Sequence, residues 1–346
     1  MPLKKITASE LADLNDSEIL KLRFKDLSLN LQDSDVSDLI EKLHSELTTK
    51  GLNFKPDFFF GDEWFSPEGM NAISIPFYLA STRLKNLEKA NMLDVEGGDA
   101  ASFMQLLRHE AGHCFDHCYQ FSKRKKWSQV FGSPNLEYQP DTYRPQPYSK
   151  SYVKHLDRWY AQAHPDEDFA ETFAVWLNPD IDWRKDYQKW PVALAKLNYL
   201  NELATESLTL KNFSEGGRYP CDVKNLTSTL EKYYQKRKRE NADEYPDFYD
   251  SDLKKIFNGA NDLSKKEFSA SRFMKKHRKA IIAAVAWATN ERKFTIDSLV
   301  RRLSLRCQEL NLKLGKTETQ TTMEAASFLT SLVKNYLFTG KFKREV

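Results

Sequence analysis

The chain has 346 residues, of which 40% are hydrophobic and 29% are charged, and it contains 7 Trp, 15 Tyr and 22 Phe. This aromatic content can fill a sizeable core, which excludes a wholly disordered chain. The sequence has no apolar run of roughly twenty residues, so no membrane-spanning helix is expected.

Charge is unevenly distributed along the chain. Residues 231–346 contain 25 Lys and Arg against 15 Asp and Glu, a net charge of +10, whereas residues 1–230 contain 27 against 34, a net charge of −7. This asymmetry predicts two functional regions. We place a first domain at residues 1–225 and a basic helical C-terminal region at residues 226–346.

The N-terminal segment and the cysteines bear on the cellular compartment. The first residues include two lysines but no following apolar segment, so no secretory signal is expected. Four cysteines form no CxxC pair. This sparse pattern is typical of a reducing compartment, and we expect a cytoplasmic protein.

The first half of the chain predicts a helix followed by two strands. Residues 35–50 are predicted to be helical because their leucines and isoleucine share one face. Residues 52–60 and 71–78 are rich in strand formers and are separated by a turn signal at residues 66–69. Pro76 favours an edge strand, whose free backbone groups could pair with a peptide substrate. The candidate substrate-binding residues are Ala72, Ile73, Ser74 and Ile75.

The rest of the chain is predicted to be mainly helical. Residues 128–148 carry four prolines and are predicted to form a loop. The predicted fold is therefore of the α+β class, with a small mixed sheet packed on two functional helices. Helices are predicted at residues 99–121, 165–178, 194–203 and 226–239, with at least three more between 252 and 342 that include 279–289 and 298–310.

The strongest motif is His109-Glu110-Ala111-Gly112-His113, inside the helix predicted for residues 99–121. Residues four apart lie one turn apart on the same face of a helix, so both histidines can bind one metal ion. Glu110 lies beside them and can accept a proton from a water that the ion activates. The motif therefore predicts a metal site for hydrolysis.

A catalytic zinc site usually takes three protein ligands and leaves one position for water. His117 lies about 12 Å from His109 along the helix axis, too far to share an ion, and we expect it to be structural. The third ligand is predicted in the helix that begins at Pro165. Glu167 is the candidate, and Asp166 is a weaker alternative.

Glu171 lies one turn beyond Glu167 on the same predicted helix. We expect its carboxylate to accept a hydrogen bond from the outer nitrogen of a ligand histidine. An acidic first turn also complements the helix dipole, and this simpler explanation suits Asp166 and Asp168.

These motifs resemble those of known zinc peptidases. His109-Glu110-x-x-His113 followed by Glu167-x-x-x-Glu171 is similar to the gluzincin pattern, and its second element resembles that of the protease domain of anthrax lethal factor. A bacterial family of zinc-binding metallopeptidases is more similar still. That likeness extends over most of the chain and is carried by the segments EWFSPEGMNAISIPFYLA, LRHEAGHCFDH and HPDEDFAETFAVWL.

The resemblance implies roles for individual residues. It implies a gluzincin-like domain with one Zn²⁺ per chain, bound by His109, His113 and Glu167, with Glu110 as general base. Glu171 matches the outer acid, although thermolysin-like enzymes use Asp there. Tyr160 matches the active-site tyrosine of the lethal-factor type, which could donate to the oxyanion. Other donors that the sequence leaves open are Tyr152, His155 and His164.

The resulting hypothesis is a zinc metallopeptidase that hydrolyses a peptide or protein substrate. The alternative is a zinc-stabilised, non-catalytic binding or regulatory protein whose basic tail recruits a partner. Basic runs at residues 236–239 and 275–279 are usually solvated helix faces, and no nucleic-acid motif accompanies them. We therefore do not expect nucleic-acid binding.

Overall fold

The structure, a computed structural model, divides into two compact units. The first unit comprises residues 1–91, 95–140 and 145–234, and the second comprises 92–94, 141–144 and 235–346. The sequence placed its domain boundary at 226. The residues described are 5–92, 94–138, 143, 145–146, 148–211, 219, 221–240, 249–257 and 268–339.

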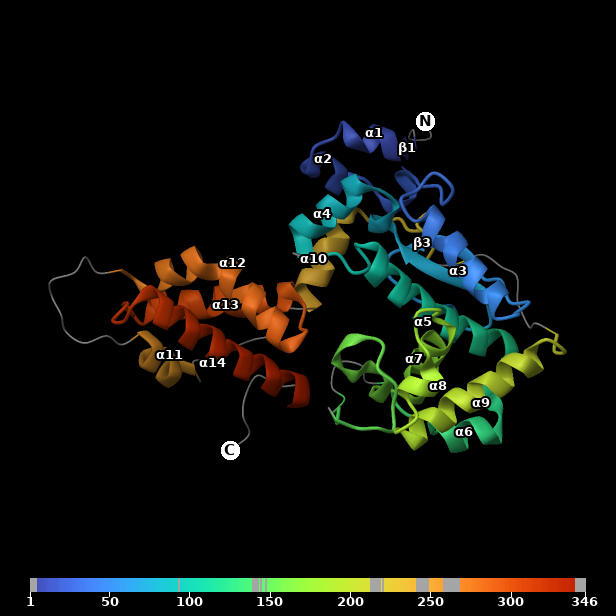
Figure 1. The fold of residues 1–346 in the computed structure, drawn as a ribbon. Helices are drawn as coiled ribbons and strands as arrows, with labels where there is room; N and C mark the ends of the chain where they lie inside the picture. Colours follow the sequence, from blue (N-terminus) through green and yellow to red (C-terminus); the bar gives the residue numbers. More distant parts are fainter. Residues whose placement is uncertain are drawn as a thin grey trace. The chain divides into compact units, whose positions relative to one another are not determined.

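The first unit combines helices with two small parallel ladders (Figure 1). Its strands are β1 (Ile6–Thr7), β2 (Leu27–Ser28), β3 (Asp57–Gly61) and β4 (Ala72–Pro76). Its helices are α1 (Ala8–Ala12), α2 (Asp16–Lys21), α3 (Ser37–Thr49), α4 (Thr82–Met92), α5 (Ala100–Tyr119), α6 (Lys125–Phe131), α7 (Pro165–Leu177), α8 (Trp183–Asp186) and α9 (Pro191–Ser207). Helix α10 (Leu230–Glu240) spans the division at residue 235.

This architecture confirms the predicted α+β class, but the sheet differs from the prediction of one small mixed sheet. Within the described residues, β1 pairs only with β2 and β3 only with β4, both in parallel. Phe65, from the connection between β3 and β4, adds a single antiparallel bridge to Ser74. The connection therefore folds back along the outer edge of β4.

Local signals explain where α5 and α7 begin and end. The Asp99 carboxylate caps α5 by accepting hydrogen bonds from the backbone N–H groups of Ala101 and Ser102, both at 3.0 Å. Helix α5 ends at Gln120, which adopts a left-handed conformation with φ of 55°. Pro165 opens α7 and Asn178 ends it. Both helices confirm the predicted ranges.

Buried aromatic rings hold α5 at the centre of the first unit. The ring of Phe115 on α5 lies within 5.4 Å, between centroids, of Phe54, Phe121 and Phe173. These partners come from the segment before β3, the segment after α5 and the helix α7. On the side facing α3, Arg108 forms a buried two-pronged ion pair with Glu46 at 2.7 and 2.8 Å. Helix α5 is thus fixed on several sides.

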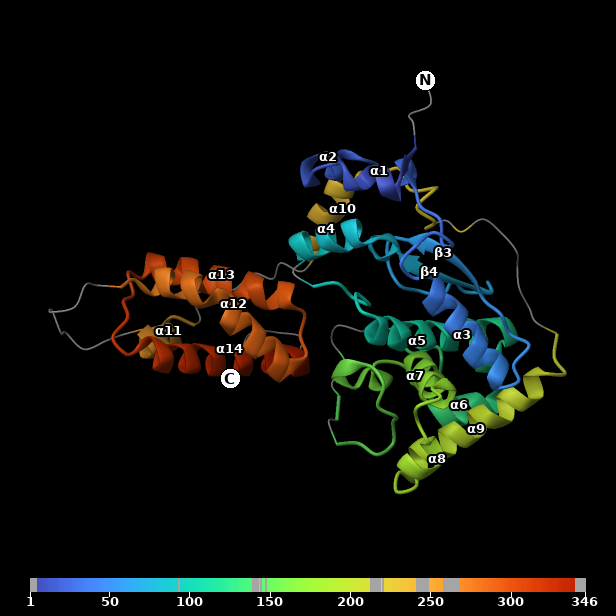
Figure 2. The same ribbon diagram turned by 45° about the horizontal axis from the view of Figure 1, so that its top comes forward.

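The second unit is helical (Figure 2) and has its own hydrophobic core. Its helices are α11 (Asp250–Phe257), α12 (Ala270–Thr289), α13 (Lys293–Glu309) and α14 (Glu318–Thr339). The predicted runs 279–289 and 298–310 lie within α12 and α13, apart from the last residue of the second run. The core is built from fully buried side chains that include Phe273, Ile281, Val285, Leu299, Leu303, Leu329 and Val333.

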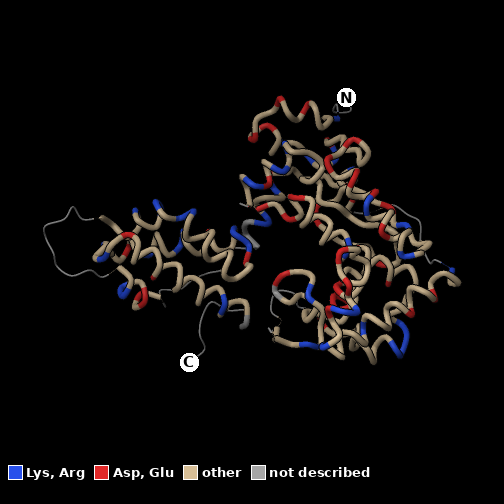
Figure 3. Tube along the Cα trace, in the orientation of Figure 1, with Lys and Arg blue, Asp and Glu red and all other residues tan. Residues whose placement is uncertain are grey.

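Basic residues are frequent on the surface of the second unit. Lys275, Lys276 and Lys279 are exposed on the first half of α12, and Figure 3 shows Lys and Arg along this part of the helix. Of the basic run 236–239, the side chains of Lys238 and Arg239 lie outside the described part of the chain, as do residues 340–346. Among the described helices, none is both long and apolar enough to cross a membrane.

Two parts of the chain differ from the sequence prediction. Residues 128–131 belong to α6 rather than to a loop, because Trp127 and Phe131 bury one face of this short helix. Residues 6–28, for which the sequence predicted no helix or strand, contain β1, β2 and the short helices α1 and α2. Helices α1 and α2 begin with reciprocal capping boxes, at Thr7 with Glu10 and at Asn15 with Glu18.

Candidate metal site

Two closely packed helices, α5 and α7, carry the candidate site. Their approach depends on Gly112, in the middle of the His-Glu-x-x-His motif. A Cβ atom at this position would lie 2.7 Å from the Cα atom and 2.9 Å from the carbonyl oxygen of Ala170 on α7. Glycine and alanine therefore allow the two backbones to meet, which brings the side chains on either side of the contact together.

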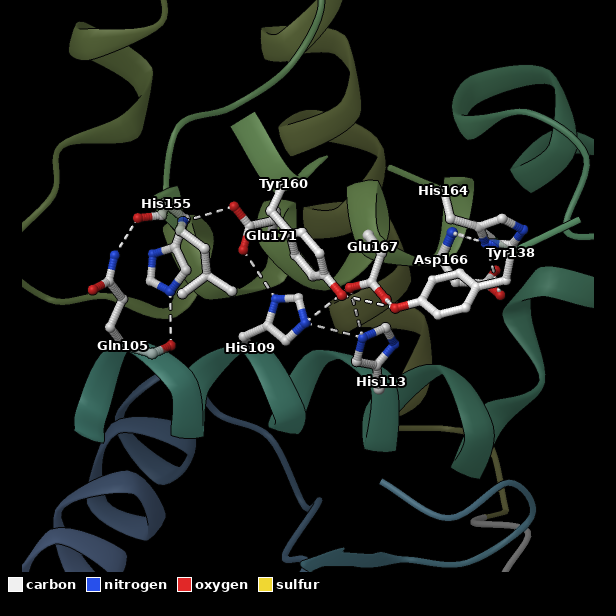
Figure 4. A network of polar contacts seen from close by, with 11 residues as sticks. Gln105, His109, His113, Tyr138, His155, Tyr160, His164, Asp166, Glu167 and Glu171 are labelled. Carbon is white, nitrogen blue, oxygen red and sulfur yellow. Dashed lines mark hydrogen bonds and ion pairs between the residues drawn. The ribbon is translucent and has the colours of Figure 1, made fainter. Parts of the chain in front are cut away.

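Three predicted ligands converge between these helices (Figure 4). His109 Nε2 lies 3.1 Å from His113 Nε2. Glu167 Oε2 lies 3.0 Å from the first nitrogen and 3.2 Å from the second. Among the described residues, no fourth His, Cys, Asp or Glu joins this group. The structure thus brings together the residues that the sequence singled out.

The spacing of these three atoms fits a tetrahedral metal ion. Ligands bound to zinc at about 2.0–2.1 Å and at tetrahedral angles stand about 3.3 Å apart. The three observed separations, 3.0, 3.1 and 3.2 Å, are only slightly shorter. Two imidazole nitrogens and one carboxylate oxygen are also the donor set of many catalytic zinc sites. The residues present therefore fit a zinc ion with one position left for water.

Glu171 fixes the orientation of His109. Its Oε1 atom accepts a hydrogen bond from His109 Nδ1 at 2.9 Å, as expected from the sequence, and its Oε2 atom accepts one from the backbone N–H of Leu156 at 2.8 Å. Glu171 is fully buried. Because Nδ1 donates to this carboxylate, Nε2 is the nitrogen that faces the other two residues of the cluster and is left to bind a metal ion.

The cluster favours an added positive charge. Burial lowers the pKa of His109, but hydrogen bonds and charges from Glu167 and Glu171 outweigh it and raise that pKa well above its usual value. Burial raises the pKa of Glu167, but the two histidines outweigh this effect and lower that pKa well below the usual range. A bound proton or a bound metal ion can supply this positive charge. The electrostatics thus agree with the geometry in favouring a cation.

Glu110 lies buried on α5 beside the two histidines. Its side chain is 7% exposed, and its Oε2 atom has no hydrogen-bond partner among the described residues. Burial raises the pKa of this carboxyl group above its usual value. An unpaired buried carboxylate oxygen is costly for folding, which points to a functional role for this side chain.

Tyr160 also reaches the cluster, from the 3₁₀ helix η4 (Asp157–Gln162). Its ring centroid lies 5.8 Å from that of His109. Burial raises the pKa of its phenol, which keeps the hydroxyl protonated and able to donate. The preceding residue, Trp159, has a left-handed φ of 54°, a conformation that is rare for such a side chain and marks a constrained turn.

Tyr138 is a site residue that the sequence prediction missed. Its hydroxyl lies 2.7 Å from Glu167 Oε1 and 2.7 Å from the Tyr160 hydroxyl. It comes from the proline-rich stretch that was predicted only as a loop. No sequence signal marks it, because 29 positions separate it from Glu167 and the pairing is created by the fold.

The alternative oxyanion donors are engaged elsewhere. His155 Nε2 contacts the backbone oxygen of Gln105 at 2.8 Å, and burial lowers the pKa of this histidine. The ring of Tyr152 lies 4.1 Å from the ammonium group of Lys196. His164 caps α7, because its Nδ1 atom accepts the backbone N–H of Asp166. Of the four candidates, Tyr160 is the one whose ring lies beside His109.

One acid and one histidine that the sequence analysis weighed as metal ligands, Asp166 and His117, lie outside the cluster. Asp166, the weaker alternative ligand, faces His164 at 3.3 Å and is not part of the metal-binding group. His117 is largely buried one turn beyond His113, and burial lowers its pKa to about 4. Both observations agree with Glu167 as the third member of the cluster.

The structure differs from the expectation for the substrate-binding strand. Ala72, Ile73, Ser74 and Ile75 form β4, and all four are fully buried. The backbone N–H of Ser74 donates to Phe65, and the Ala72 carbonyl accepts from Ser66. The outer edge of β4 is therefore already occupied in part by the chain itself, because the connection from β3 returns along it.

Comparison with known proteins supports the chemistry of the cluster. Residues 101–214 match a family model described as "Putative zinc-binding metallo-peptidase". The match contains α7 and nearly all of α5, and it does not extend to the segment around residues 63–80 or to the second unit. No curated protein and no solved structure matches the chain. Residues 101–214 are therefore similar to a family of zinc-binding metallopeptidases, which confirms the resemblance found in the sequence for this part of the chain.

Proposed function

We propose that the protein is a zinc-dependent metallopeptidase that hydrolyses peptide bonds. The observation that carries this proposal is the convergence of His109, His113 and Glu167 within 3.2 Å of one another, beside the unpaired buried carboxylate of Glu110. The family match over residues 101–214 supports the same reaction class. The gluzincin-type fold is part of this proposal and is what the resemblance of the two motifs implies.

The donor set selects the metal. Imidazole nitrogens and a carboxylate oxygen suit zinc, whereas Mg²⁺ and Ca²⁺ prefer sites built from oxygen ligands. His109, His113 and Glu167 would hold the ion. When bound, zinc supplies a Lewis acid that lowers the pKa of water and polarises the scissile carbonyl.

The surrounding side chains perform the proton transfers and charge stabilisation. Glu110 accepts a proton from the attacking water at its unpaired oxygen and later delivers that proton to the leaving amine. Its raised pKa suits both steps, since a base must also be able to return the proton. Tyr160 donates its hydroxyl hydrogen to the oxyanion that forms at the carbonyl.

The substitution Glu110→Gln tests this function. The amide has the shape of the carboxylate but cannot accept the proton, so we expect peptide hydrolysis to fall by a factor of about 100 or more. Zinc content should stay close to one ion per chain, because Glu110 is not a ligand. Cleavage of a fluorogenic peptide library and metal analysis of the same preparation provide the measurement.

The matched control is Glu88→Gln, which makes the same change at a buried glutamate on α4. It should retain wild-type hydrolysis. A Glu110→Gln protein as active as the wild type would refute the proposed mechanism. A wild type that holds zinc but cleaves no peptide or protein would favour the alternative, a zinc-stabilised binding protein whose basic C-terminal region recruits a partner.

A further inference from the structure

Leu136 and Tyr138 are held against the N-terminus of α7. His164 Nδ1 accepts the backbone N–H of Asp166, so its Nε2 atom carries the proton and donates to the Leu136 carbonyl at 3.0 Å. The Tyr138 ring packs edge-on against His164, with centroids 5.5 Å apart. These contacts place the Tyr138 hydroxyl at the metal cluster, as Figure 4 shows.

The two oxygen atoms of Glu167 have different surroundings. Oε2 faces both histidines at 3.0 and 3.2 Å, whereas Oε1 accepts the Tyr138 hydroxyl at 2.7 Å. A hydroxyl bound to an ionised carboxylate forms a charge-assisted hydrogen bond, which is stronger than a neutral one. Only one of the two carboxylate oxygens is therefore directed at the ligand nitrogens.

We propose that Tyr138 is a positioning residue that holds Glu167 Oε1 away from the zinc ion, so that Glu167 binds through Oε2 alone. This inference rests on the proposed function. A carboxylate that binds through both oxygens takes an additional coordination position, and catalytic zinc needs a position for water. Tyr138 thereby protects the position that hydrolysis uses, and it also fixes the orientation of a metal ligand.

The same hydrogen bond determines what Tyr160 does in the substrate-free protein. An ionised carboxylate cannot donate, so the single proton of the Tyr138 hydroxyl goes to Glu167. The Tyr160 hydroxyl, 2.7 Å away, is then the donor to the Tyr138 oxygen. To stabilise an oxyanion, Tyr160 has to exchange this partner for the substrate. Tyr138 is thus linked to both the metal ligand and the proposed oxyanion donor.

The test compares Tyr138→Phe with two other tyrosine-to-phenylalanine variants in the full-length protein. Tyr160→Phe removes a hydroxyl that bonds to Tyr138, and Tyr148→Phe removes one from a side chain that is 93% exposed. Zinc affinity is measured by competition with a chelator. We expect about tenfold weaker zinc binding for Tyr138→Phe, the usual loss when a partner of a metal ligand is removed. The other two variants should bind within about threefold of the wild type, a change too small to indicate a lost ligand partner.

A cobalt-substituted protein separates positioning from general structural support. The visible absorption of Co²⁺ weakens when its coordination number rises from four to five. In Tyr138→Phe, Glu167 is free to bind through both oxygens, so we expect weaker visible bands than in the wild type. Tyr160→Phe and Tyr148→Phe should keep the wild-type spectrum.

The outcomes distinguish this inference from the proposed function. Zinc affinity and cobalt spectra of Tyr138→Phe that equal those of the wild type would overturn the role of Tyr138 and leave the peptidase proposal intact. A wild type that binds neither zinc nor cobalt would overturn both. Weaker zinc binding together with an altered cobalt spectrum, confined to Tyr138→Phe, would establish that Tyr138 positions Glu167.

Discussion

Glu167 and Glu171 lie one turn apart on α7, yet their surroundings differ. Glu167 faces the nitrogens of both histidines, whereas Glu171 accepts hydrogen bonds from His109 Nδ1 and the Leu156 backbone. The first carboxylate is placed to bind the metal ion, and the second to orient a ligand. Sequence spacing alone left this division of roles as a hypothesis.

Alanine substitutions should separate these two carboxylates by metal content. Glu167→Ala removes a ligand, and we expect almost complete loss of zinc. Glu171→Ala leaves all three ligands in place but frees the His109 ring, so zinc affinity should fall by about 10- to 100-fold. Metal analysis after dialysis against a fixed free zinc concentration provides the measurement.

The control at this scale is Asp166→Ala, which removes the neighbouring carboxylate and should keep the zinc. Asp166 faces His164 rather than the cluster. If Asp166→Ala lost its zinc and Glu167→Ala kept it, the third ligand would have to be reassigned.

At the scale of elements, the site depends on how closely α5 approaches α7. Gly112 faces Ala170 where the helices cross, and a Cβ atom there would come within 2.7 Å of backbone. A flexible side chain could move aside, but the backbone of a packed helix cannot. The glycine therefore fixes the distance between the histidines on one helix and the carboxylates on the other.

Substituting Gly112 with Ala should destabilise the first unit. In an open helix position this change stabilises by about 1 kcal/mol, because alanine is the better helix former. Here the added methyl group overpacks the crossing, and we expect the free energy of unfolding to fall by about 1–3 kcal/mol. Urea unfolding followed by tryptophan fluorescence reports on this unit, because the sole tryptophan of the second unit, Trp287, is 86% exposed.

The reverse substitution at an exposed position of the same helix is the matched control. Ala101 is exposed in the first turn of α5, and Ala101→Gly should lower the free energy of unfolding by less than about 1 kcal/mol through helix propensity alone. If Gly112→Ala instead stabilised the protein by a similar amount, the close contact would not limit the helix approach.

At the scale of the whole molecule, the three proposed metal ligands all belong to one of the two compact units. His109, His113 and Glu167 lie in the first unit, and the second has a separate core formed by α11 to α14. A ligand that binds only the native state stabilises the part that binds it. Metal removal should therefore affect the two units differently.

Hydrogen exchange with and without a chelator tests this expectation. At a zinc concentration 100 times the dissociation constant, binding stabilises the native state by about 2.7 kcal/mol. Backbone amides of α5 and α7 should lose protection when zinc is removed, while those of α12 and α13 keep theirs. Equal loss of protection in both units would show that the metal stabilises the chain as one cooperative body.

The sequence predicted the parts of the fold that depend on local signals. Caps, proline positions and apolar periodicity predicted α5 and α7 almost to the residue. The structure also contains helices in every range predicted after α7. Residues 128–131 were assigned to a loop because prolines follow them, whereas burial of Trp127 and Phe131 makes them helical. Tertiary packing outweighed the local signal there.

By itself, the sequence predicted the donor types of the site, because two histidines one helical turn apart with Glu110 beside them follow from helix geometry, whereas Glu167 on α7 joins the histidines only through the fold. Only the tertiary structure decided which distant groups complete the site. Tyr138 reaches Glu167, Leu156 reaches Glu171, and residues 63–66 occupy part of the edge of β4. Each of these contacts joins a helix or strand to a loop between 6 and 29 positions away. In a loop, no repeating geometry relates position in the chain to position in space.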